Sequence, residues 1–83
     1  MSLEYYKKQM VDLRARLQKE KDAKKKDNEY YARCIKCATT PTSKASYRKS
    51  KIDHAASHDR QIESLKRQIE TCKENIARER KRK

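Results

Sequence analysis

The chain contains no tryptophan, no phenylalanine and no glycine, and it has one proline. The lack of glycine largely excludes the tight turns of β-hairpins and the loops that cradle phosphate groups. Only 34% of the 83 residues are hydrophobic, so the chain cannot fill the core of an ordinary globular domain. Its apolar side chains must instead lie in a narrow strip within a single small domain, residues 1–83.

The sequence also has no apolar run of the length that a signal peptide or a membrane span requires. We therefore expect no membrane contact and an intracellular location, in the cytoplasm or the nucleus. The three cysteines are an odd number, which in a reducing compartment indicates free thiols rather than a disulfide framework. Nothing in the sequence builds a cleft that could desolvate a catalytic group, so we expect neither an enzyme nor a small-molecule substrate.

Charge is abundant: 43% of the residues are charged and the net charge is +12. Low hydrophobicity with high net charge is typical of disordered chains. The regular spacing of the apolar residues argues against disorder here. In the first half they alternate at three and four residues, and acidic residues precede basic ones by four, as in Asp12 and Arg16. This pattern predicts a helix over about residues 3–38, with the apolar series Leu3, Tyr6, Met10, Leu13 and Leu17.

The second half repeats the same alternation over three heptads. It predicts a second helix over about residues 47–81, with the series Ala55, His58, Ile62, Leu65, Ile69, Cys72 and Ile76. Between the helices, residues 39–46 collect Thr, Ser and Pro41, and we expect the turn there. Pro41 disfavours helical backbone at Thr40, and Ser43 or Ser46 could cap the second helix, with Ser50 and Asp53 as a weaker capping box.

The two series agree with an antiparallel hairpin that folds back symmetrically about Pro41. In that arrangement Met10 faces Cys72 and Leu13 faces Ile69, as antiparallel coiled-coil packing requires. The sequence therefore predicts an all-α, two-helix coiled-coil hairpin. The strip between its helices, called the seam below, is formed by Tyr6, Met10, Leu13, Leu17, Ile62, Leu65, Ile69, Cys72 and Ile76.

Near the turn the expected pairing is poorer. Glu20 faces Ile62, Lys24 faces His58, and Cys34 faces Arg48, so we expect a looser tip or a shifted register for the tyrosines there. The seam is also thin for a chain of this size. We therefore expect the hairpin to gain stability by self-association or by docking on another helical protein.

Four residues, Cys34, Cys37, His54 and His58, resemble the ligands of a Cys2His2 zinc finger in their order and short spacings. The resemblance implies a zinc site, but it covers a minority of the chain. The 16 residues between Cys37 and His54 exceed the family's usual twelve or so, and the finger's strands and core residues are missing. In the symmetric hairpin the cysteines and histidines lie roughly 9 Å or more apart along the axis. We therefore expect no cofactor, with a nonclassical zinc clasp as the alternative.

The excess of basic residues indicates a second alternative, a protein that binds the phosphate backbone of DNA or RNA. Interleaved acids could instead neutralise much of this charge within the helices. The candidate polyanion contacts are Arg48, Lys49, Lys51, Arg78, Arg80, Lys81, Arg82 and Lys83. Small helical hairpins also occur among secretion-system substrates, but the Trp-x-Gly turn of the best-known group is absent. The sequence favours a non-enzymatic coiled-coil assembly protein that binds itself or another helical protein.

Overall fold

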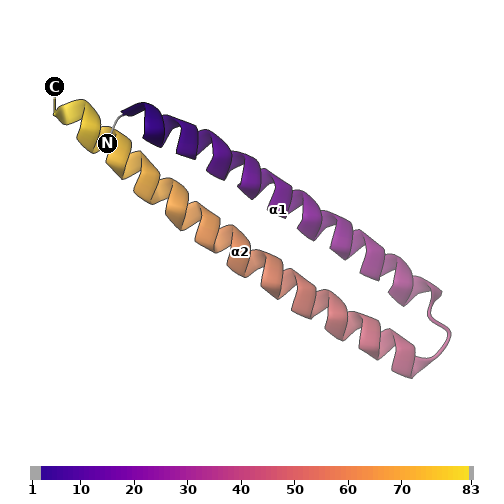
Figure 1. Ribbon diagram of the computed structural model, residues 1–83. Coiled ribbons are helices and arrows are strands. Elements are labelled where there is room, and N and C mark those ends of the chain that lie inside the picture. The colour runs from indigo at the N-terminus through magenta and orange to yellow at the C-terminus, as the bar shows by residue number, and fades with distance from the viewer. Residues whose placement is uncertain (1–2, 83) are drawn as a thin grey trace.

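A computed structural model describes residues 3–82 of the chain. It consists of two long helices, α1 (Leu3–Cys37) and α2 (Pro41–Lys81), packed side by side in opposite directions. Figure 1 shows the resulting rod, with both ends of the chain at one extremity and the connection at the other. The rod measures 66 × 14 × 13 Å. The predicted all-α antiparallel hairpin is confirmed.

The turn is shorter than the sequence analysis predicts. The connection comprises only residues 38–40, and α2 begins at Pro41 rather than near residue 47. Neither Ser43 nor Ser46 caps this helix: the N-cap is Thr40, whose extended backbone precedes proline and whose side chain accepts a hydrogen bond from the Ser43 amide at 3.1 Å. Proline fits the first position of a helix because a backbone N–H there would have no acceptor within the helix, so its absence costs no hydrogen bond.

The connection also turns without a left-handed residue. Among residues 3–82 no residue has a positive φ, so this hairpin has no position that calls for glycine. The Ala38 amide donates to the Cys34 carbonyl at 2.9 Å and completes the last turn of α1. The absence of glycine from the sequence is therefore compatible with a tight helix-to-helix connection.

The core lies in the half of the rod that carries the chain ends. Its buried members are Met10 and Leu13 from α1 and Ile69 and Cys72 from α2, with Cys72 exposing 2% of its surface. The Cys72 thiol donates a hydrogen bond to the Tyr6 carbonyl at 3.1 Å. Residues Tyr6, Leu17, Leu65 and Ile76 pack against this core and are partly buried. This cluster agrees with the pairing expected from folding about Pro41.

The surface of the rod is highly charged. The predicted pair of Asp12 and Arg16 forms at 3.1 Å, and two further pairs join residues three apart, Glu70 with Lys73 and Glu79 with Arg82. Neither α1 nor α2, over the residues described, carries an apolar stretch long enough to cross a lipid bilayer.

Candidate functional site

A layer of charged and polar side chains occupies the middle of the seam, where the apolar residues run out. At its centre His58 lies between two carboxylates of α1. Its Nδ1 is 2.6 Å from Oε1 of Glu20, and its Nε2 is 2.6 Å from Oδ2 of Asp27. Glu20 and Asp27 are seven residues apart, so they project from the same face of α1 two turns apart. One imidazole therefore bridges two turns of the opposite helix.

His54 extends this layer toward the tip of the hairpin. Its Nδ1 lies 3.3 Å from the same Asp27 oxygen, and its Nε2 lies 3.3 Å from the Tyr31 hydroxyl. The rings of Tyr31 and His54 also meet edge to face, with centroids 5.1 Å apart. On the other side of the layer, the Lys24 ammonium donates to Asp59 at 2.5 Å. We call Glu20, Lys24, Asp27, Tyr31, His54, His58 and Asp59 the polar layer.

The contacts of His58 raise its pKa, chiefly through the hydrogen bond with Asp27 and then through the one with Glu20, against a small opposing effect of burial. The same contacts lower the pKa of Asp27, first through His58 and then through His54. The two shifts have one cause, because these contacts favour the charged form of each group. A protonated imidazole donates a hydrogen bond from each of its two nitrogens, and an ionised carboxylate accepts such a bond. The side chain of His58 is 18% exposed, so the pair is partly shielded from water.

The polar layer fixes how the two helices are aligned. A slip of one heptad would exchange one of the two carboxylates beside His58 for Leu13 or Cys34, neither of which can accept a charged hydrogen bond of that strength. Polar residues at seam positions commonly specify coiled-coil register at some cost in stability. The polar layer can do the same here.

In this middle region the ionic contacts differ from those expected from facing positions. Facing positions pair Lys24 with His58 and Glu20 with Ile62, which leaves each charged group without an ionic partner. The structure instead pairs Glu20 with His58, one turn along α2, and Lys24 with Asp59, one residue along α2. Searching for opposite charges within one turn of each facing position would have found both contacts.

The four residues of the candidate zinc clasp do not assemble. His54 and His58 contact the carboxylates of the polar layer, whereas Cys34 and Cys37 lie in the last turn of α1. Among residues 3–82, no three or more His, Cys, Asp and Glu side chains are arranged to hold a metal ion. The three cysteines are free thiols, with Cys72 buried, Cys34 half-buried and Cys37 exposed.

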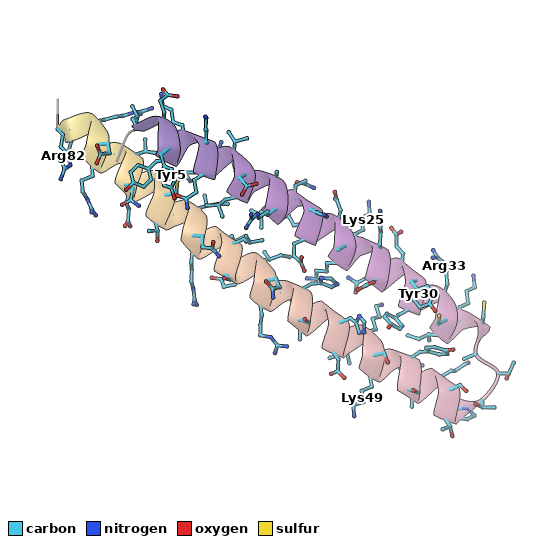
Figure 2. All side chains as sticks on the ribbon, in the orientation of Figure 1. Tyr5, Lys25, Tyr30, Arg33, Lys49 and Arg82 are labelled. Atoms are coloured by element: carbon cyan, nitrogen blue, oxygen red, sulfur yellow. The ribbon has the colours of Figure 1, made fainter. Side chains whose placement is uncertain are left out.

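Tyr30 lies beside these two thiols and contacts a second aromatic residue of the tip. Tyr30 and Tyr31 meet edge to face with centroids 5.1 Å apart. A hydrogen bond with the Cys34 thiol is the main cause that raises the pKa of Tyr30, with Tyr47 among the nearby groups that add to it. Tyr30, Arg33, Cys34 and Cys37 line one shallow hollow at the end of α1, near which Figure 2 labels Tyr30 and Arg33.

The predicted site residues separate into two groups. Eight of the nine seam residues form the core and its border, while Ile62 is half-buried outside that cluster. Most of the candidate polyanion contacts that the structure describes lie on the surface, as Figure 2 shows for Lys49 and Arg82. Lys51 is half-buried, Lys83 lies outside the described residues, and the others, Arg48, Lys49, Arg78, Arg80, Lys81 and Arg82, are exposed.

Comparison with known proteins gives no relative: no protein-family model, no curated protein and no solved structure matches the chain. The function must therefore be argued from the residues themselves.

Proposed function

We propose that the chain is a non-enzymatic coiled-coil assembly protein that works bound to another copy of itself or to another helical protein. The observation that carries this proposal is the small core of a long rod. Over a length of 66 Å, four of the described hydrophobic side chains are buried. A hairpin with so little buried apolar surface is marginal alone, because the ordering of its backbone opposes folding.

Exposed apolar side chains support the same proposal. Val11 on α1 is 70% exposed and Ile52 on α2 is 68% exposed, although both are aliphatic residues that favour burial. Tyr30 and Tyr47 are also exposed, at the tip. Covering such residues with a second helical surface would add buried area where the hairpin itself supplies little.

Sedimentation of variants tests this proposal. Replacing Ile52 by Lys should weaken association without loss of helical signal, because the side chain already faces water. Gln61→Lys places the same charge at an exposed position on the opposite side of α2, nine residues further along, and serves as the matched control. An association that both variants weaken equally would reflect charge alone and would remove the support that Ile52 gives.

A second candidate function, binding to the phosphate backbone of nucleic acid, has an observation of its own. Of the 24 Lys and Arg residues, four in the described part of the chain form ion pairs with carboxylates: Arg16, Lys24, Lys73 and Arg82. Self-neutralisation within the helices is therefore limited. The unpaired charge would attract polyanions with little regard to base sequence.

Deleting residues 80–83 tests the second candidate. If nucleic acid is the partner, the loss of these four basic residues should lower affinity for all sequences alike and flatten the salt dependence of binding. Sedimentation with and without a DNA duplex at low and raised salt is the measurement. Assemblies that form equally well without DNA favour the first candidate, and salt-sensitive complexes with DNA favour the second.

A further inference from the structure

The thiol pair, Cys34 and Cys37, is the part of the tip that neither helix packing nor the polar layer uses. The two residues are three apart in the last turn of α1, so they lie on one side of the helix. Both line the same shallow hollow, with Tyr30 and Arg33 as the other lining residues. The buried third cysteine, Cys72, lies in the core at the opposite end of the rod and cannot join them.

The spacing of this pair suits a soft metal ion. Two thiolates bound to one tetrahedral zinc lie about 3.8 Å apart when each Zn–S bond is about 2.3 Å, and the two-residue separation is common in structural zinc sites. Side chains three apart on a helix have Cβ atoms about 5 to 6 Å apart, so rotation about the side-chain bonds can bring the sulfurs to that distance. The helix ends at Cys37, which leaves the second thiol at the edge of the regular backbone.

One chain offers only half of such a site. Structural zinc takes four ligands, and in the described residues no third donor accompanies the pair. Both histidines are engaged elsewhere: His58 with Glu20 and Asp27, and His54 with Asp27 and Tyr31. The missing two ligands must come from outside the chain, and a second copy presents the same pair at the same end of its rod.

We propose that Cys34 and Cys37 of two copies bind one zinc ion as a four-thiolate site that joins two hairpins at their tips. Binding would convert four thiols and one Zn²⁺ into a zinc tetrathiolate of charge −2 with release of four protons, since coordinated thiols are deprotonated. This inference extends the proposed self-association by naming its partner and its contact. It departs from the expectation of no cofactor, because the two missing ligands come from a second chain.

The surroundings of the thiol pair fit this charge. Arg33 lines the hollow, so two tips that meet there bring positive charge to the doubly negative cluster. Without the metal the same cations would repel each other, which makes the contact depend on zinc.

Zinc titration under reducing conditions tests the inference. Protein kept reduced by a phosphine should bind one zinc per two chains, measured by competition with a chromophoric chelator, and should sediment as a dimer that a chelator dissociates. Small-angle scattering should give a maximum dimension well above the 66 Å of one rod, because the chains meet at one end. Cobalt(II) in place of zinc should show the intense visible bands of a tetrahedral thiolate site.

Three variants separate this site from its alternatives. Cys37→Ser should abolish zinc binding and the zinc-dependent dimer while leaving the helical signal intact, because Cys37 is exposed. Lys36→Ala, its exposed neighbour, should retain zinc and controls for disturbance of the last turn. His54→Ala should also retain zinc, so its loss there, or one zinc per single chain, would overturn the tip-to-tip site in favour of an intrachain clasp.

These measurements distinguish failure of the zinc site from failure of the proposed self-association. Dimers that form without zinc and are no longer than one rod would contradict the zinc-bridged tip while supporting assembly along the hairpin. A protein that binds no zinc in the competition assay would likewise overturn the inference.

Discussion

Leu13 is the residue on which the packing of the two helices can be tested most cleanly. It is 4% exposed and packs with Met10, Ile69 and Cys72 in the core. We predict that Leu13→Ala lowers the free energy of unfolding by ~2–5 kcal/mol, since the methyl groups lost leave a cavity. Urea unfolding followed by circular dichroism measures the change.

Lys66→Ala is the matched control for Leu13. Lys66 follows the partly buried Leu65 but is itself exposed, and its loss should change stability by less than about 0.5 kcal/mol. Leu17 and Leu65 are only partly buried, so their replacement by Ala should cost less than that of Leu13. Equal losses for Leu13→Ala and Lys66→Ala would contradict the observed seam.

The shifted pKa values of His58 and Asp27 predict how the stability of the hairpin depends on pH. Its folded-state pKa is raised above the ordinary value of 6.5, so its contribution is complete below that value and is lost as pH rises through the folded-state pKa. Asp27 has a folded-state pKa lowered from 3.8, so its contribution is complete above that value and is lost as pH falls through the lowered pKa. Stability should therefore be highest between about pH 4 and 6.5.

Thermal unfolding of wild type and His58→Gln over pH 4 to 9 measures this dependence. Glutamine keeps one hydrogen-bond donor but cannot carry the charge, so the fall in stability above pH 6.5 should disappear in this variant. His54 lies at the longer distance of 3.3 Å from Asp27, so the His54→Gln variant should retain most of the fall in stability above pH 6.5. A profile for His58→Gln that parallels wild type above pH 6.5 would rule out His58 as the titrating group.

At the residue scale, heptad spacing predicts which apolar residues cluster, and the four-residue spacing predicts the Asp12–Arg16 pair within α1. The ionic contacts between the helices are not predicted by matching facing positions one to one, because Glu20 reaches His58 one turn away and Lys24 reaches Asp59, one residue beyond its facing position. The sequence pattern groups the thiol pair with His54 and His58, which in the structure contact carboxylates of the polar layer.

At the scale of the helices, the start of α2 depends on Thr40. The Thr40 hydroxyl accepts a hydrogen bond from the Ser43 amide at 3.1 Å and satisfies one of the free donors of the first turn. We predict that Thr40→Ala destabilises the hairpin by ~1 kcal/mol in urea unfolding. Thr39→Ala, at the exposed residue just before it, should change little; a larger loss there would mean that the cap is misassigned.

The existence and packing of the two helices were predicted better than the start of α2. The long heptad series determines that two helices exist and where they pack. Their boundary was misplaced because Pro41 was treated as the centre of a loop, although proline is equally suited to the first position of a helix. With Thr40 before it as an N-cap, the residues predicted as turn become the first turns of α2.

At the scale of the whole molecule, the rod is divided along its length. The apolar core lies beside the chain ends, the polar layer occupies the middle, and the thiol pair lies at the tip. Among the described residues, the buried hydrophobic cluster lies in the first of these regions. The other two offer charged groups and thiols for the contacts that we propose.

The central claim is that this hairpin, which buries little apolar surface, becomes stable by associating with another chain. The direct measurement is thermal unfolding over a range of protein concentrations, combined with sedimentation equilibrium of the same samples. Self-association predicts a midpoint temperature that rises with concentration and a mass above that of one chain, because mass action favours the folded assembly. A well-folded monomer with one midpoint temperature at every concentration would contradict the claim.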